Sequence, residues 1–302
     1  MSTSNTMNVN KKWVLIADLS LIFVAMVWGA SYAISKEVLT FVPVLSLITL
    51  RFTLALVIIA PITYRELRRS RKQDIYSGIL LGLILSFIFM SETFGVFYTT
   101  ATNAAFLISL CIVMTPILDA IVHGKKPSIT IICCAVVSCL GTAFMVLTEG
   151  LSLNSGDILI LIAAFLRAIM VVSTKHLMRD NTISSASLTC VQLLTVTTFT
   201  GTLALIFNDS KGLSLTSSYE FWVALFFLSG FCTLAAFYIQ NTAVRLTNPT
   251  RVSFLMGTEP IFGAIFASIL LSESMTVMSV IGASLILIGS YFGARYASSV
   301  RE

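Results

Sequence analysis

The sequence predicts an all-α integral membrane protein with ten transmembrane helices, arranged as two inverted five-helix repeats. Three observations lead to this prediction. Apolar segments of about 20 residues, each long enough to cross about 30 Å of hydrocarbon, recur from one end of the chain to the other. A stretch of the first half returns in the second half, and the basic residues fall almost entirely on one side of a ten-helix arrangement.

The composition excludes an ordinary soluble domain. The chain is 57% hydrophobic and only 11% charged, whereas soluble domains carry about 25% charged residues. All six cysteines lie inside apolar segments, and no CxxC or cysteine–histidine spacing indicates a metal site. We therefore expect neither a metal nor another cofactor.

Ten apolar segments follow one another, separated by short polar breaks. They span residues 13–35, 43–64, 75–98, 102–122, 128–148, 157–178, 184–207, 219–243, 250–271 and 277–295. The predicted organisation is a disordered cytoplasmic tail (1–12), a first repeat (13–148, helices 1–5), a second repeat (157–295, helices 6–10) and a cytoplasmic tail (296–302). No cleavage site follows the first apolar segment, so we expect that segment to be retained.

The repeat is visible in the residues themselves. TNAAFLISLCIVMTPILDAIVHGKKPS (102–128) returns as TNPTRVSFLMGTEPIFGAIFASILLSES (247–274), and WGASYAISK (28–36) has a weaker echo in RAIMVVSTK (167–175). With five spans in each copy, the second copy must enter the membrane upside down relative to the first. Inverted halves around a central site are typical of carriers that open alternately to each side.

The basic residues predict the orientation. Fifteen of the 19 lysines and arginines fall on one side: Lys11, Lys12, Arg65, Arg68, Arg69, Arg71, Lys72, Lys125, Lys126, Lys175, Arg179, Arg245, Arg251, Arg295 and Arg301. Because lysine and arginine accumulate in cytoplasmic loops, both termini should be cytoplasmic. The net charge of +5 then reflects membrane topology and not a nucleic-acid-binding surface. A bacterial inner membrane is the expected location.

Three segments carry a resemblance to a known family. WGASYAISK in the first span, LRF (50–52) in the second and EPIFGAIFASILLSESMTVMSVIGASLILIGSYF (259–292) at the end resemble the EamA-like family of the drug/metabolite transporter superfamily. The resemblance implies ten helices in two inverted repeats, with a central cavity lined mainly by the first four helices of each half. It also implies transport of small organic solutes, often the export of amino acids or related metabolites.

Ionisable side chains inside the spans are the first candidate site residues. Such a residue costs about 2.5–3.5 kcal/mol on insertion scales, so it usually faces a cavity or a partner. Arg51, Glu92, Arg167 and Glu259 are candidate substrate ligands, whereas Asp119 is expected near the cytoplasmic interface. Structural alternatives stay open: Arg51 can pair with Glu92, and Arg167 can be the counter-ion of Glu259.

Two prolines and two aromatic residues complete the expected site. Pro260 directly follows Glu259, and Pro116 follows Thr115 at the equivalent position, so both prolines are candidate hinges or gates and only the second copy carries the carboxylate. Trp28 and Tyr32 share one face of the first span, and Arg167 occupies the position in the second copy that Trp28 holds in the first. Aromatic packing or a lipid-facing belt is the alternative for this pair.

Two amides and the overall charge pattern bear on the ligand. Gln240 and Asn241 lie at about the repeat equivalent of Glu92 and are candidate ligands, with interhelical hydrogen bonding as the alternative. Mixed charges suit a zwitterion such as an amino acid, or a larger nucleotide-like metabolite such as S-adenosylmethionine stacked on Trp28 and Tyr32. Protons are a candidate coupling ion, and the chain is expected to act as a monomer or homodimer.

Other function classes are less compatible with the sequence. A membrane enzyme would need a nucleophile, a metal set or a cofactor motif, and neither GxSxG nor HExxH is present. A channel would need a filter-like polar loop, and a scaffold would not need ionisable residues within its spans. A secondary-active or exchange carrier, most simply an exporter, is therefore the expected function.

Overall fold

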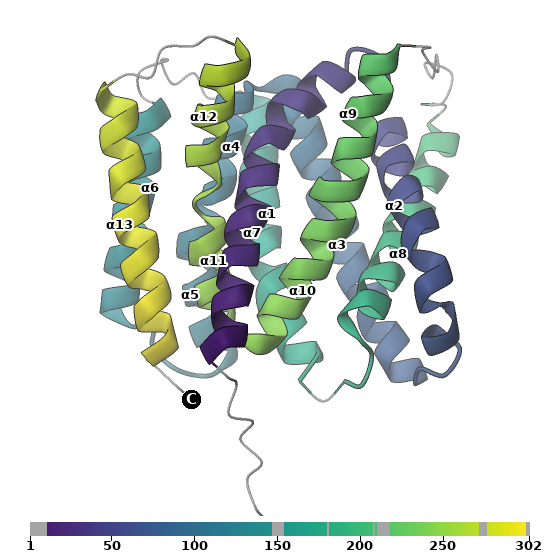
Figure 1. Cartoon of the computed structure of the whole chain (residues 1–302), viewed down its shortest axis with the longest axis horizontal. Helices are drawn as coiled ribbons and strands as arrows, with labels where there is room; N and C mark the ends of the chain where they lie inside the picture. The colour runs from purple at the N-terminus through teal and green to yellow at the C-terminus, as the bar shows by residue number, and fades with distance from the viewer. Residues whose placement is uncertain are drawn as a thin grey trace, which may run out of the picture.

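A computed structural model describes residues 11–146, 154–179, 181–207, 209, 218–271 and 277–299, and its regular structure is entirely helical. The elements are α1 (Lys11–Val38), α2 (Val44–Leu67), α3 (Lys72–Tyr98), α4 (Ala101–Ser109), α5 (Cys111–Val122), α6 (Ile129–Val146), α7 (Ser155–Leu177), α8 (Ser185–Ile206), α9 (Tyr219–Ser229), the π-helix η3 (Gly230–Ala235), α10 (Ala236–Leu246), α11 (Pro249–Met256), α12 (Glu259–Leu271) and α13 (Val277–Ser299). The helices run side by side between two ends of the molecule (Figure 1).

Eight helical stretches in the described part of the chain are long and apolar enough to cross a membrane. They coincide with eight of the ten predicted segments. Of the other two segments, one forms the shorter apolar helix α6, and the other forms α11 and α12, which are separated by Gly257 and Thr258. The all-helical membrane fold is therefore confirmed, and the count of ten crossings stays a prediction.

Some predicted boundaries differ from the structure. Helix α1 already begins at Lys11, inside the predicted 1–12 tail, and α13 continues to Ser299, past the predicted end at 295. Residues with good helix propensity, such as Ala and Arg, carry a helix beyond its apolar stretch. Residues 1–10 and 300–302, with most of the break between the repeats (147–153), lie outside the described residues.

Three spans predicted as continuous helices are interrupted. The fourth is divided at Leu110 into α4 and α5, the eighth contains η3, and the ninth is divided into α11 and α12. Because Pro260 has no N–H to bond the carbonyl of Met256, the α-helical ladder weakens there, and α11 ends at Met256. Pro260 therefore directly follows a break, whereas Pro116 lies inside α5 and away from the break at Leu110.

Helix packing repeats between the two halves. The third helix of the first repeat, α3, packs along the first helix of the second repeat, α7. The equivalent pair in the other direction is α1 with the segment α9–η3–α10, and these also pack together. In the same way, α1 contacts α11 and α12, and α7 contacts α4 and α5. The equivalent helices α2 and α8 pack on each other, as do α6 and α13, the pair at one edge of Figure 1. Exchanging the halves leaves this pattern unchanged, so the fold has the pseudo-twofold arrangement that an internal repeat produces.

Both described ends of the chain lie on one side of the bundle. Helix α1 begins and α13 ends at the lower edge of Figure 1. At this edge, Arg251 forms an ion pair with Asp18, and Glu66 accepts hydrogen bonds from Ser184 and Ser187. At the opposite edge, Thr99 donates to Asp157 at 2.5 Å. Polar contacts therefore join the two repeats at both ends of the bundle.

Candidate functional site

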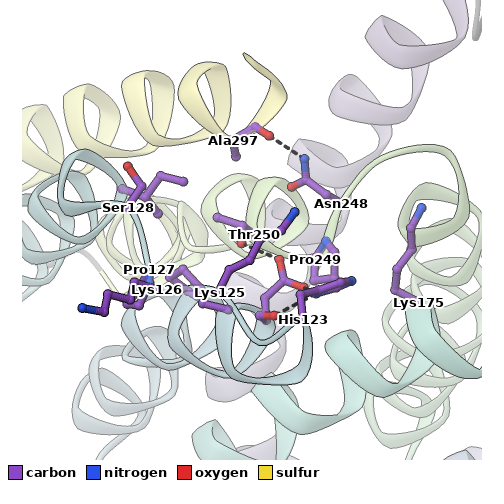
Figure 2. Close-up of a pocket in the computed structure, with 14 residues that line it drawn as sticks. His123, Lys125, Lys126, Pro127, Ser128, Lys175, Asn248, Pro249, Thr250 and Ala297 are labelled. Carbon is purple, nitrogen blue, oxygen red and sulfur yellow. Dashed lines mark hydrogen bonds and ion pairs between the residues drawn. The ribbon is translucent and has the colours of Figure 1, made fainter. Parts of the chain in front are cut away.

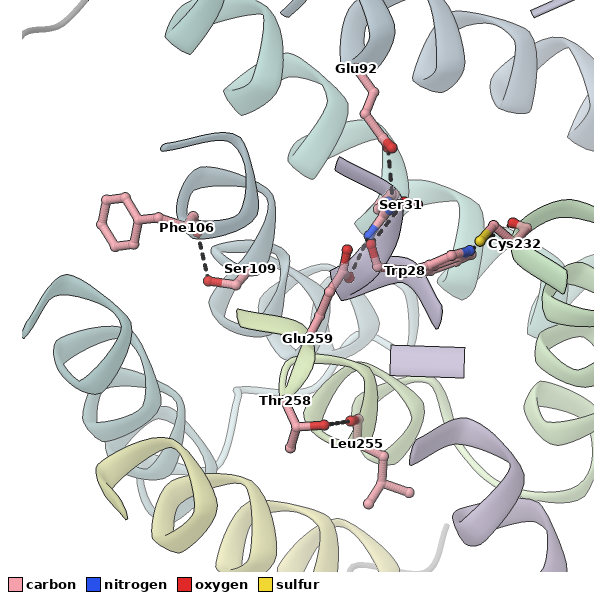
Figure 3. Close-up of polar contacts among 10 residues, drawn as sticks. Trp28, Ser31, Glu92, Phe106, Ser109, Cys232, Leu255, Thr258 and Glu259 are labelled. Atoms are coloured by element: carbon pink, nitrogen blue, oxygen red, sulfur yellow. Dashed lines mark hydrogen bonds and ion pairs between the residues drawn. The ribbon is translucent and has the colours of Figure 1, made fainter. Parts of the chain in front are cut away.

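The side chain of Arg167 on α7 lies between two carboxylates near the middle of the bundle. Its Nη1 donates to Oε2 of Glu259 on α12 at 3.1 Å, and its Nη2 donates to Oε2 of Glu92 on α3 at 3.1 Å. The three side chains are only 12%, 3% and 10% exposed, respectively. Figure 3 shows Glu92 and Glu259 reaching toward the same point from opposite sides. We call these three residues the central triad.

The triad decides between the ion pairs that the sequence left open. Arg167 is the counter-ion of Glu259, as one alternative held. The possible Arg51–Glu92 pair is wrong for this structure, because the ion pair of Glu92 is with Arg167. Glu92 belongs to the first repeat, and the other two residues belong to the second. The triad therefore joins the halves through charge-assisted hydrogen bonds, which are among the stronger polar contacts in proteins.

Trp28 on α1 lies directly against the triad. The guanidinium carbon of Arg167 is 4.3 Å from the centre of the Trp28 ring, a cation–π contact worth about 0.5–2 kcal/mol. The two residues at equivalent repeat positions therefore meet each other. The neighbouring Gly29 permits this approach of α1 to α12, because a Cβ there would lie 2.7 Å from the carbonyl oxygen of Glu259.

Arg51 contacts the π-helix, and among the described residues it forms no hydrogen bond or ion pair with the triad. Its Nε donates to Oγ1 of Thr233 at 2.5 Å, and its Nη2 donates to the carbonyl of Cys232 at 3.1 Å. The same carbonyl accepts Nε1 of Trp28 at 2.8 Å. A π-helical turn is often found at functional sites and redirects backbone groups. Here it presents one carbonyl to two side chains of the first repeat.

A small cavity, which we call the central cavity, borders the triad. It has a volume of about 20 Å³, room for about one water molecule, and its wall includes Arg167, Glu259, Gln240 and Cys111. Oε1 of Glu259 and Oε1 of Gln240 are both buried and accept no hydrogen bond from described residues. The buried Tyr32 hydroxyl lies close enough to Glu259 to interact electrostatically, but without a hydrogen bond of good geometry. Two unused acceptors therefore face one space.

The remaining candidates divide between the cavity and the scaffold. Gln240 lines the cavity, but its neighbour Asn241 points to α8, where its Nδ2 donates to Thr189 and Gln192 at 2.9 Å and 2.8 Å. This is the interhelical bonding expected as the alternative for the amides. Asp119 accepts a hydrogen bond from Thr250 near the basic end of the bundle, the end where α1 begins and α13 ends. Its expected position at the cytoplasmic interface stays a prediction.

Several contributors were missed from the sequence. Cys232 and Thr233 carry no pattern that marks a π-helix. Asp18 was overlooked as the partner of Arg251, although an acidic residue inside an apolar segment is a signal that could have found it. The small residues Ser109, Thr115 and Ser253 line the central cavity, and nothing distinguishes them from ordinary packing residues in the sequence.

Comparisons with known proteins agree with this architecture. The model of the EamA-like transporter family matches residues 15–147 and again residues 154–294. An uncharacterized transporter of Archaeoglobus fulgidus is 25% identical over 274 residues, which is 91% of this chain and 84% of the relative. An uncharacterized transporter of Bacillus subtilis is 26% identical over 281 residues, covering 86% of this chain and 88% of the relative.

A solved structure shares the fold. A protein of known crystal structure superimposes with a TM-score of 0.76 at 14% identity, over 95% of this chain and 99% of the other. At this identity the likeness concerns the fold alone.

Proposed function

We propose that this chain, which belongs to the EamA-like transporter family, is a secondary-active or exchange carrier of small organic metabolites that works by alternating access. Membership in this family and the long apolar helices make it a multi-pass membrane transporter. The substrate, the direction of transport and the mechanism are our proposals. The observation that carries them is the central triad, in which Arg167 is shared between Glu92 and Glu259.

The carrier is proposed to cross the membrane ten times, as two inverted five-helix repeats. Helix α6 and the broken pair α11–α12 supply the two crossings beyond the eight long apolar stretches. Two features support this count: both described ends lie on one side of the bundle, and helix packing repeats between the halves. The repeats are proposed to occupy 13–148 and 157–295, and to rock against each other around the triad.

The basic end is proposed to face the cytoplasm, with both termini there, in the cell membrane. Single cysteines in a cysteine-free background test this orientation in intact cells. A cysteine replacing the exposed Ser155 should react with an impermeant reagent from outside. A cysteine replacing the exposed Gln73 should react only after the cells are opened. The reverse pattern would overturn the orientation.

A zwitterion such as an amino acid is the proposed substrate class. The centre of the bundle contains two positive side chains, Arg51 and Arg167, and two negative ones, Glu92 and Glu259, so these four charges sum to zero. A substrate carboxylate can replace one triad carboxylate on Arg167, and the substrate ammonium can then bind the carboxylate that is released. The unused acceptors of Glu259 and Gln240 favour a ligand that carries N–H donors. No net charge is buried in this exchange.

A larger nucleotide-like metabolite such as S-adenosylmethionine is the second candidate, because Trp28 and Tyr32 offer rings for stacking. Two observations favour the smaller zwitterion. Arg167 covers one face of the Trp28 ring, and the central cavity of about 20 Å³ would have to open less for an amino acid than for a nucleotide-like ligand. A nucleotide-like substrate would require both a displaced arginine and a much larger opening.

Export with protons as coupling ion is the proposed direction and energy source. The ionised carboxylate of Glu259 can bind the substrate ammonium, whereas the protonated carboxyl cannot, so binding of the substrate displaces the proton. After the substrate has left, the buried carboxylate favours uptake of a proton again, and that proton is carried back in the opposite direction. Proton and substrate would then alternate at one site, as an exchanging carrier requires.

The experiment is reconstitution of the purified protein into liposomes after a thermal-shift screen against a metabolite panel, since a bound ligand stabilises the folded state. A carrier shows saturable uptake that is accelerated by substrate preloaded inside the vesicles. A channel shows neither property, and a scaffold shows no flux. Uptake that does not saturate, or no uptake of any stabilising compound, would contradict the proposal.

A further inference from the structure

We propose that the cavity at the basic end is the mouth of the transport route, a vestibule that collects the carboxylate of the substrate, and that the Thr250–Asp119 hydrogen bond closes it toward the central cavity. This inference rests on the proposed function. The vestibule would be a second region that binds the substrate, separate from the central triad.

The vestibule lies between α5, the turn that follows it, and the start of α11 (Figure 2). Its volume is about 150 Å³, which is on the order of five water molecules at ~30 Å³ each. Lys125 extends toward Thr250 and Asn248, with Lys175 at one side and Ser128 at the other (Figure 2). The space is therefore large enough for a carboxylate together with its first waters.

The charge of this wall selects anions. Lys125, Lys126 and Lys175 line the vestibule, and the one carboxylate among its lining residues is Asp119. Within the described residues, Lys125 and Lys126 form no ion pair, whereas the Nζ of Lys175 is fixed by the carbonyls of Arg245 and Thr247. A cleft lined by charge of one sign raises the local concentration of ligands of the opposite sign.

The same two helices line the vestibule and the central cavity. On α5, Asp119 faces the vestibule, and Thr115, one turn earlier, faces the central cavity. On α11, Thr250 faces the vestibule, and Ser253, three residues later, faces the central cavity. The spaces are therefore consecutive along one interface, which leads to Arg167.

A hydrogen bond joins these helices at the boundary. Oγ1 of Thr250 donates to Oδ2 of Asp119 at 3.1 Å, in the last turn before the central cavity. Asp119 also lies 3.3 Å from Nδ1 of His123. The bond links the second repeat to the first, so relative movement of the repeats would break it. It is thus placed to act as a latch.

The opposite end of the molecule has the opposite character. A larger cavity of about 460 Å³ lies between the end of α1 and the start of α9. Its wall is mainly apolar, and its charged residues are Glu37 and Glu220. A carboxylate is attracted to the lysine end and repelled at this one. For a zwitterion, the difference favours entry at the basic side with the carboxylate end leading, as proposed for an exporter.

The charge of the vestibule can be measured without a known substrate. The reporter is Ser128→Cys in a background where all six native cysteines are alanine. The probes are an anionic and a cationic methanethiosulfonate, 2-sulfonatoethyl and 2-(trimethylammonium)ethyl. We expect the ratio of the anionic to the cationic modification rate to be about fivefold higher at this cysteine than at a free thiol in solution. This preference should decrease at high salt. Pro127→Cys is a second reporter at the same wall.

Matched charge variants make this measurement specific. The pair Lys125→Gln and Lys126→Gln should remove the preference for the anionic probe. The control pair Arg69→Gln and Arg71→Gln removes the same charge from exposed positions outside the vestibule and should leave the preference unchanged. A ratio equal to that of the free thiol, or one unaffected by the lysine variants, overturns the anion-collecting role. If the probe ratio behaves as expected but the protein transports no substrate, the proposed function is contradicted and the anion-collecting role is not.

The latch is tested with a native reporter of the central cavity. Cys111 lines that cavity and can be kept as the only cysteine. Thr250→Val removes the hydroxyl and should accelerate modification of Cys111 by the anionic probe about tenfold, because the closed state loses one hydrogen bond to a charged group. Thr250→Ser retains the hydroxyl and should react like the parent. Equal rates in all three proteins would show that the bond closes nothing.

Discussion

Nη1 of Arg167 lies 3.1 Å from Oε2 of Glu259, and this ion pair joins α7 to α12 at a point where α12 has just begun after a break in the helix. The break places Glu259 in the first turn of α12, where its side chain reaches the guanidinium. An ion pair at an interrupted helix can be exchanged for contacts to a substrate with little movement of the rest of the bundle.

Replacing Arg167 by Gln should abolish transport and lower stability by about 3–5 kcal/mol, because Glu92 and Glu259 would be left as uncompensated buried charges. The triple variant Glu92→Gln, Arg167→Gln, Glu259→Gln should recover much of that stability while remaining inactive. Thermal unfolding in detergent and counter-flow in liposomes measure the two quantities. Recovery of transport in the triple variant would return the triad to a structural role.

Replacing Glu259 by Gln should uncouple transport from protons. Exchange of substrate between the two sides should continue, since the amide still accepts a hydrogen bond, but a pH gradient should no longer drive accumulation. The matched control is Glu220→Gln, at the far cavity, which should keep full coupling. Uptake by the Glu259 variant that still responds to a pH gradient would exclude this carboxylate as the proton carrier.

Replacing Arg51 by Gln should affect stability more than substrate affinity. Arg51 fastens α2 to the π-helix through Thr233 and Cys232, and its loss should cost about 1.5–3 kcal/mol. The KM for transport should stay within about twofold of the parent, because no bond of Arg51 reaches the triad. A KM raised tenfold with unchanged thermal stability would make Arg51 a substrate ligand after all.

Replacing Gly141 by Ala should separate α6 from α13. A Cβ at Gly141 would lie 2.6 Å from the carbonyl oxygen of Gly282, and such overpacking costs about 1–3 kcal/mol. Gly201→Ala is the matched control, because its nearest contact would be 3.4 Å away, an ordinary van der Waals distance. Melting temperatures in one detergent compare the two variants. An equal effect of both would indicate that the α6–α13 contact is not tight.

The sequence predicted the scaffold and the ionisable residues of the site, but not all of their partners. Apolar segment length and the internal repeat depend on composition, and both are readable without coordinates. An intramembrane charge such as Arg167 is costly, so its presence alone predicts a partner or a cavity. The partner depends on how each helix is rotated about its axis, which explains why the sequence left an Arg51–Glu92 pair open although Glu92 contacts Arg167.

The interruptions of the helices were the least predictable feature. The π-helix adds a residue to one turn and rotates the following residues, so Gln240 faces the cavity while Asn241 faces α8. Neither Cys232 nor Thr233 signals this turn. Pro260 did indicate a weakened ladder, and a break is found just before it. Pro116 gave the same signal, but its helix continues through it.

We propose that the triad is the substrate site of an alternating-access carrier. The most direct test is counter-flow of a ¹⁴C-labelled amino-acid mixture into liposomes preloaded with the same unlabelled mixture. An alternating-access carrier with its substrate site at the triad should show saturable uptake that depends on preloading and is lost in Arg167→Gln at equal amounts of folded protein. Uptake that ignores preloading, or that persists undiminished in Arg167→Gln, would contradict it.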